Sequence, residues 1–261
     1  MTDDPSNGEP LAEGTLVSHL LELRTRLLRS VMAIVICFIP LAFYQDKLFT
    51  LVASPLIEKL PKGTSLIATS VVSPFMTPFK VAFYVGLFVA MPVVIYQIWA
   101  FVAPGLYRRE KRFAVPLLVS SVILFYAGAV FAYYAVFPVM FSYLVGTAPT
   151  GVSYMPDMAS YLDFVLTLFF AFGVAFEMPV AVVLLVITGL VNVDTLGKNR
   201  GYVIIGIFVV AAFLTPPDAI SQTIMAAPMY LLYEGGLVMA RIMLKMRGNA
   251  EAAEKEEAKA S

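Results

Sequence analysis

The residues whose types could support chemistry are a few acids that lie within or beside long apolar segments. Glu177 lies inside the apolar sequence FGVAFEMPV, where a charge costs at least ~2.5 kcal/mol and marks a polar cavity or a function. The alternative is a protonated glutamate that holds two helices together by hydrogen bonding. Asp163 lies nearer the end of its segment, where hydration makes an acid inexpensive. Together, Glu177 and Asp163 could form the proton relay of a permease.

Two further acids stand beside cations. Glu110 lies among four cations in the sequence PGLYRREKRF (residues 104–113). Cations on a short loop indicate only on which side of the membrane the loop lies. They do not explain why an acid stands among them. Glu22 lies four residues before Arg26 in SHLLELRTRLLRS, and an ion pair at this spacing on a helix contributes only ~0.2–0.5 kcal/mol. Periodicity alone favours this structural role for Glu22.

The residue content excludes several classes of function. Cys37 is the only cysteine and His19 the only histidine, so neither an internal disulfide nor a histidine-based metal site is available. The motifs GxxxxGK[ST], GxSxG and HExxH are absent. We therefore expect no enzyme, no cofactor, no metal and no nucleic-acid partner.

The composition predicts an integral membrane protein. Hydrophobic residues make up 60% of the 261 residues, against ~45–50% in soluble domains. Six apolar segments emerge, and we interpret them as membrane spans of an all-α polytopic protein. Their approximate ranges are 27–44, 79–103, 114–145, 161–190, 201–214 and 219–239.

Prolines and turns modify these spans. Pro92, Pro138 and Pro179 are candidate kink points. The last two spans flank the turn TPPD, and the apolar runs next to it are short, so this pair is expected to form a short helical hairpin that thins the bilayer. Asp218 follows the turn and is expected to be an N-cap. Glu234 is expected to face the lipid headgroups.

Charge asymmetry predicts the orientation. With six spans, 14 of the 18 Lys and Arg residues fall on the side that holds both termini, so both termini are expected in the cytoplasm. Residues 1–26 form a cytoplasmic segment with an amphipathic helix, residues 27–241 the transmembrane domain, and residues 242–261 a disordered charged tail. In the external region 45–78, the sequence DKLFTLVASPLIEKL predicts an interfacial helix bent by Pro55.

An ordered series of motifs goes beyond composition. It consists of HLLELRTRL, SPL followed by LP, SPFMTPFKVAF, YQIWAFVAPGLYRREKR, FGVAFEMPV and LTPPDAISQ. The series resembles the TatC family, the multispanning receptor component of the bacterial twin-arginine translocation system. The resemblance covers about residues 16–241 and is close to proteobacterial members.

This resemblance implies a function and a set of partners. TatC-like proteins bind the twin-arginine signal peptides of folded precursor proteins in the bacterial cytoplasmic (inner) membrane. They act with the single-span proteins TatA and TatB, and the protonmotive force drives export. The family fold is a concave, glove-like bundle, which accounts for the short last spans. Self-association and contact with membrane lipid are also expected.

The resemblance also assigns site residues. Glu22 and Glu110 match the acids of the signal-peptide site. Phe101, Leu106 and Tyr107 lie near that site, and Arg24 and Arg26 match the basic residues of the N-terminal motif. Pro55 and Phe75 match the external-loop motifs, Glu177 the buried acid on the concave side, and Asp218 the acid after the hairpin turn. A guanidinium pair could form forked, charge-assisted hydrogen bonds with carboxylates, which lysine cannot reproduce.

Overall fold

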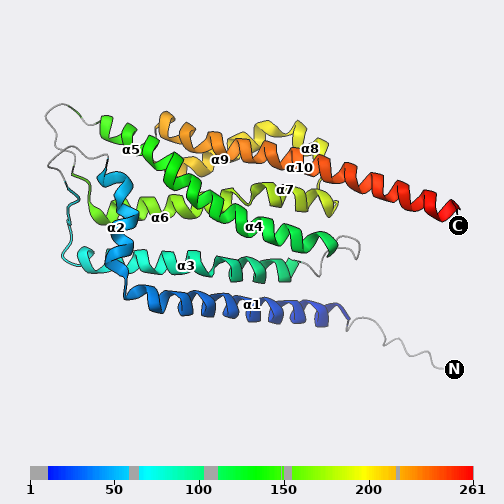
Figure 1. Ribbon diagram of the computed structural model, residues 1–261, viewed down its shortest axis with the longest axis horizontal. Helices are drawn as coiled ribbons and strands as arrows, with labels where there is room; N and C mark the ends of the chain where they lie inside the picture. Colours follow the sequence, from blue (N-terminus) through cyan, green and yellow to red (C-terminus); the bar gives the residue numbers. More distant parts are fainter. Residues whose placement is uncertain are drawn as a thin grey trace, which may run out of the picture.

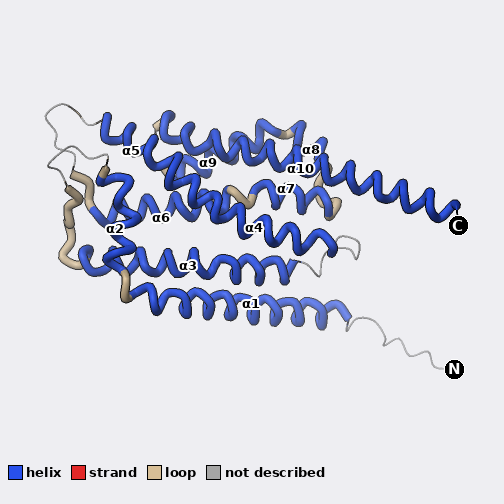
Figure 2. The backbone as a smooth tube through the Cα atoms, in the orientation of Figure 1, coloured by secondary structure: helices blue, strands red, loops and turns tan. Residues whose placement is uncertain are grey.

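The computed structural model describes residues 11–58, 65–102, 111–147, 149, 155–215 and 218–260. Its regular elements are helices, and no strand occurs in these ranges (Figures 1 and 2). The elements are α1 (Leu11–Ala42), α2 (Gln45–Ile57), α3 (Ser73–Val102), α4 (Lys111–Phe131), the π-helix η2 (Ala132–Val136), α5 (Phe137–Gly146), α6 (Met158–Ala175), α7 (Met178–Ile187), α8 (Val193–Lys198), α9 (Arg200–Leu214) and α10 (Ala219–Ala260).

Six apolar helical stretches run side by side (Figure 1). Five are long and apolar enough to cross a membrane: Ser18–Ala42, Ser73–Val102, Val115–Gly146, Met158–Ile187 and Ala219–Met246. The sixth, Arg200–Leu214, is shorter. The prediction of an all-α polytopic membrane protein is confirmed, including the short fifth apolar helix.

Two of the three prolines that were predicted to be kink points lie where the regular α-helix is interrupted. Pro138 lies just after η2, which interrupts the third apolar stretch as a π-bulge. Pro179 lies in the first turn of α7, after a break at Phe176 and Glu177. Pro92, in contrast, lies inside the uninterrupted helix α3.

Helix α2 crosses the end of the bundle that lies opposite the two chain termini (Figure 1). Val52, Ala53 and Leu56 are buried in the core between α3, α5 and α6. The hydroxyls of Ser54 and Tyr133 lie 2.9 Å apart and fasten α2 to η2. The expected helix is present, but it packs onto the bundle as well as lying across its end.

A second connection at the α2 end of the bundle joins the segment before α3 to the start of α6. Ile67 exchanges backbone hydrogen bonds with Pro156 and Met158, at 3.1 and 2.8 Å. Asp157 caps α6 by accepting from the backbone N–H of Ser160, and it also accepts from the hydroxyl and N–H of Thr69. These hydrogen bonds, above all that from Ser160, hold the pKa of Asp157 well below its usual range.

The last helix is longer than the sequence predicted. Helix α10 continues to Ala260, so it extends past residue 239, the expected end of the last span, and through the segment that was expected to be a disordered tail. The carboxylate of Glu234 within this helix is bound by Arg200 and Tyr230. Beyond it, the sequence EAAEKEEAKA consists of strong helix formers with Glu and Lys four residues apart. Its high charge is therefore compatible with a helix.

Helix α1 packs mainly on α3, and the two backbones approach closely at Gly86. A Cβ atom added at Gly86 would lie 2.9 Å from the Cα of Phe38, a backbone atom that cannot rotate away. Gly86 is therefore the position at which the α1–α3 contact depends on the absence of a side chain.

We predict that Gly86→Ala lowers the free energy of unfolding by about 1–3 kcal/mol, because the added methyl group separates α1 from α3. The measurement is denaturant unfolding of the protein in detergent. Gly206→Ala on α9 is the matched control, since nothing lies within 4 Å of a Cβ at that position. Equal stability of the two variants would contradict the close α1–α3 approach.

Candidate functional site

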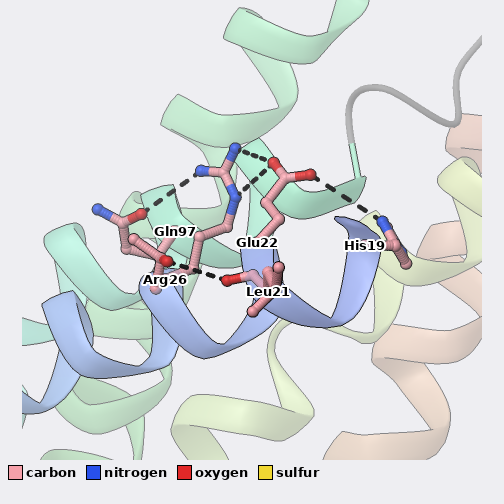
Figure 3. A network of polar contacts seen from close by, with 6 residues as sticks. His19, Leu21, Glu22, Arg26 and Gln97 are labelled. Carbon is pink, nitrogen blue, oxygen red and sulfur yellow. Dashed lines mark hydrogen bonds and ion pairs between the residues drawn. The ribbon is translucent and has the colours of Figure 1, made fainter. Parts of the chain in front are cut away.

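A polar cluster joins α1 to the last turns of α3, at the end of the bundle where both chain termini lie (Figures 1 and 3). Oε1 of Glu22 accepts hydrogen bonds from Nε and Nη2 of Arg26, at 2.9 and 2.5 Å. Nη1 of Arg26 donates a long hydrogen bond of 3.5 Å to Oε1 of Gln97 on α3. The ion pair predicted from spacing is confirmed, and it is tied to a second helix.

The other oxygen of Glu22 has a weaker partner. Nδ1 of His19 lies 4.0 Å from Oε2, which is beyond hydrogen-bond distance (Figure 3). The His19 ring stacks on Phe101, with ring centroids 4.2 Å apart and planes inclined by 23°. The Glu22 side chain is 35% exposed, and Oε2 accepts no hydrogen bond from the described residues. We call His19, Glu22, Arg26, Gln97 and Phe101 the α1–α3 cluster.

The structure brings together only part of the predicted signal-peptide site. Glu22, Arg26 and Phe101 belong to the α1–α3 cluster, and Arg24 is exposed on the same helix. Leu106, Tyr107 and Glu110 lie outside the described residues. The chain leaves α3 at Val102 and re-enters α4 at Lys111, at the same end of the bundle (Figure 1).

Sequence reasoning missed two members of the cluster. Gln97 is a buried amide in an apolar span, and this burial of a polar group was the signal that could have identified it. His19 lies three residues before Glu22 on α1, but its stacking on Phe101 joins residues that are distant in sequence. Both contacts depend on how α1 lies against α3.

Glu177 lies at the break between α6 and α7 and lines a largely apolar cavity of about 970 Å³. Residues of α3, α6, α7, α9 and α10 form the rest of its wall. Oε1 of Glu177 is buried with no hydrogen-bond partner among the described residues, while the carboxyl group interacts with Ser121 of α4. Ser121 in turn accepts from Nε1 of Trp99, at 3.1 Å. The cavity therefore contains a polar group that is only partly satisfied.

Asp163 is not placed for direct proton exchange with Glu177. It accepts a 2.6 Å hydrogen bond from Nζ of Lys80, and both side chains are about half exposed. Fourteen residues of mostly helical chain separate the two acids, a rise of about 20 Å. Direct transfer between them is excluded by this distance.

The predicted external residues lie at the opposite end of the molecule from the α1–α3 cluster. Pro55 lies within α2, and Phe75, in the first turn of α3, is exposed and stacks on Phe79. Asp218 accepts from the backbone N–H of Ser221 at 2.7 Å, which confirms the predicted N-cap of α10. This hydrogen bond is the main reason that the pKa of Asp218 is lowered.

A second Arg–Glu pair, not predicted from the sequence, joins α9 to α10. Nε of Arg200 donates to Oε1 of Glu234 at 2.5 Å, and Nη2 donates to Oε2 at 2.9 Å. The Tyr230 hydroxyl donates to Oε1 at 2.8 Å. Glu234 is thus bound within the protein, where the sequence had suggested that it faces the headgroups.

In the part of the chain that the structure describes, no group of three or more His, Cys, Asp or Glu residues is placed to hold a metal ion. The fold and the sites together define a polytopic α-helical membrane protein. It has a carboxylate–guanidinium cluster at one end and an open, largely apolar pocket between helices that is lined by one acid, Glu177.

The chain belongs to the TatC family. The family described as Sec-independent protein translocase protein (TatC) matches residues 18–228. The chain is 54% identical to the TatC protein of Azotobacter chroococcum mcd 1 over 91% of this chain and 92% of the relative. It is 50% identical to that of Escherichia coli (strain K12), over 90% of this chain and 92% of the relative.

A solved structure agrees with this assignment. The crystal structure described as twin arginine translocase receptor TatC is 36% identical and superposes with a TM-score of 0.77. The match covers 86% of this chain and 98% of the solved chain. The family expected from the ordered motifs is confirmed.

We predict that Glu177→Gln reduces protein export less than Glu177→Ala, because an amide can replace part of the hydrogen bonding of a neutral acid. Export of a reporter precursor is measured in cells at matched protein level. Binding of a signal peptide should be retained in both variants, since Glu177 lies inside the bundle away from the α1–α3 cluster. Loss of peptide binding in Glu177→Gln would contradict this separation of roles.

Proposed function

We propose that this chain recognises twin-arginine signal peptides as the receptor component of the Sec-independent protein translocase. The observation that carries the proposal is the carboxylate of Glu22: Arg26 occupies one oxygen, and the other accepts no hydrogen bond from the described residues of this partly exposed side chain. The similar crystal structure is described as that of a twin arginine translocase receptor, which supports the same role. A role in transport means that the chain is not an enzyme.

The chemistry of Glu22 suits an arginine ligand. Oε2 can accept a charge-assisted hydrogen bond from an incoming guanidinium group, and hydrogen bonds of this class contribute ~1.5–3 kcal/mol. We propose that Glu110 supplies a second carboxylate from the adjoining loop, so that each signal arginine has an acceptor. Phe101, Leu106 and Tyr107 would then contact the apolar part of the peptide. Arg24 and Arg26 complete the charged surface of α1.

The remaining partners follow from the family. We propose that TatA and TatB assemble with this chain in the bacterial inner membrane, that copies of the chain associate with one another, and that the protonmotive force drives export. Both termini are assigned to the cytoplasm, which places the α1–α3 cluster where precursors are made. The external motif residues Pro55, Phe75 and Asp218 then lie on the opposite side. Glu177 is assigned a role in transport within the bundle.

The alternative of a proton-coupled permease has less support. It requires a relay between Glu177 and Asp163, and the separation of about 20 Å along the helical chain does not provide one. The ion pair between Asp163 and Lys80 gives Asp163 a structural partner.

We predict that Glu22→Gln and Glu110→Gln each weaken binding of a twin-arginine peptide about tenfold, because each removes one charge-assisted hydrogen bond at a partly solvated site. Binding of a labelled synthetic peptide to the purified protein is measured in detergent. The discriminating test is a double-mutant cycle between each acid and each signal arginine changed to Gln.

The cycle has a clear negative outcome. Additive losses for an acid with both arginines would mean that the acid does not contact the pair and only balances charge within the receptor. Protein level and thermal unfolding of each variant are compared with the parent, so that loss of binding is separated from loss of fold.

The orientation is tested by cysteine labelling in a Cys37→Ala background. Val71→Cys, at a position 99% exposed next to the start of α3, should react with a membrane-impermeant reagent in spheroplasts. Asn199→Cys, exposed between α8 and α9, should react only after permeabilisation. Labelling of Asn199→Cys in intact spheroplasts would reverse the orientation inferred from the basic residues.

A further inference from the structure

The two Arg–Glu pairs of the described chain differ in how completely the carboxylate is used. In the pair between α9 and α10, the two oxygens of Glu234 bind two different nitrogens of Arg200, and Tyr230 adds a third hydrogen bond. In the α1–α3 cluster, both nitrogens of Arg26 converge on Oε1 of Glu22. Both carboxylate oxygens of Glu234 accept hydrogen bonds from these residues, whereas only one oxygen of Glu22 does so.

Arg26 has a second acceptor within reach. Its Nη1 already donates to Oε1 of Gln97, at the long distance of 3.5 Å. Gln97 is only 8% exposed, so water is a poor substitute partner for its amide oxygen. A small movement of the guanidinium from Glu22 towards Gln97 would strengthen this contact. The Arg26 side chain is 20% exposed, which leaves it partly hydrated during the movement.

We propose that Arg26 is an internal competitor for Glu22 and that Gln97 receives Arg26 when a peptide arginine binds. In the free receptor, the guanidinium of Arg26 holds Oε1 and neutralises the carboxylate, so a ligand cation gains the full charge of Glu22 only when Arg26 withdraws. When an arginine-bearing peptide arrives, its guanidinium takes Glu22, and Arg26 shifts to the amide oxygen of Gln97. The inference rests on the proposed function, because it assigns a regulatory residue to the same site.

The competition has a quantitative consequence. If the acid is free of Arg26 for only a fraction of the time, the apparent dissociation constant of every cationic ligand rises by the inverse of that fraction. The penalty is therefore equal for strong and weak ligands. Peptides that form only weak contacts would fall below useful affinity, whereas an arginine pair with several charge-assisted hydrogen bonds would still bind. Arg26 thus sets the affinity threshold of the receptor.

The first test measures two synthetic peptides, one with adjacent arginines and one with adjacent lysines, on the purified full-length protein at about 0.15 M salt, where the Debye length is about 8 Å. Arg26→Gln should tighten both peptides by the same factor, about two- to fivefold, which corresponds to loss of a partly exposed ion pair. Glutamine at this position keeps a polar side chain beside Gln97.

Arg29→Gln is the matched control for the change in net charge. Arg29 is exposed on the same helix, one turn from Arg26, and makes no hydrogen bond or ion pair to other described residues. Its substitution should change peptide affinity less than Arg26→Gln does. Weaker binding by Arg26→Gln, or equal tightening by both variants, would overturn the proposal, because Arg26 would then be a supporting partner of Glu22 or a general repulsive charge.

The second test asks whether the Arg26 guanidinium moves to the amide oxygen of Gln97 when a peptide binds. Gln97→Met keeps the length of the side chain and removes the acceptor, so it should weaken binding of the twin-arginine peptide in the parent protein. In the Arg26→Gln background, the same substitution should have no effect, since no guanidinium needs to be received. Equal weakening in the two backgrounds would contradict the transfer, and thermal unfolding of all variants identifies any loss of fold.

Failure of this inference is distinguishable from failure of the proposed function. If Glu22→Gln leaves the affinity for both peptides unchanged, the peptide site itself is disproved. If Glu22→Gln weakens binding while Arg26→Gln does not tighten it, the receptor site stands and only the competition is refuted.

Discussion

Polar groups that enter the hydrocarbon of a membrane lose water as a hydrogen-bond partner, and the chain meets this constraint in nearly every element. Helices satisfy their own backbone groups, which explains why the described apolar stretches are all helical. Where a helix is interrupted, at η2 and between α6 and α7, part of the break packs into the core between neighbouring helices. Side-chain acids are treated in the same way, since each must find a partner within the protein or lie near water.

The acids differ in how many of their carboxylate oxygens are hydrogen-bonded within the protein, and this difference indicates their role. Glu234 is fully bound by Arg200 and Tyr230 and holds α9 against α10. Glu22 is hydrogen-bonded through one oxygen only and has a partly exposed side chain, which suits a site that exchanges partners. Glu177 has one buried oxygen without a hydrogen-bond partner among the described residues and lines a cavity. Saturation favours a structural role, whereas incomplete saturation favours a functional one.

The two ends of the bundle are built for different tasks. At the end where α3 ends and α4 begins, α1 and α3 meet through a partly exposed polar cluster. At the other end, α2 covers the helices, and Asp157 ties the segment before α3 to the start of α6. A bundle with one end braced by α2 and with an incompletely hydrogen-bonded acid at the other end is consistent with the proposed receptor, which binds its ligand on one side of the membrane.

The sequence by itself determined the class of protein, the number of apolar helices and the position of the acids, because these depend on local hydrophobicity and spacing. The pair of Glu22 and Arg26 was predictable for the same reason, as its members are four residues apart. The ordered motifs were also sufficient to identify the family. Only the tertiary structure decided which residues join across helices.

The contacts that depend on tertiary structure share one physical cause. Gln97 reaches Arg26 across 71 residues of sequence, and Glu234 reaches Arg200 across 34, so both contacts require two helices to be packed in register. Sequence reasoning therefore assigned Glu234 to the headgroups. It predicted Glu22 as a site residue but not the hydrogen bonding of its two oxygens or the contact between Arg26 and Gln97, because these depend on how α1 lies against α3.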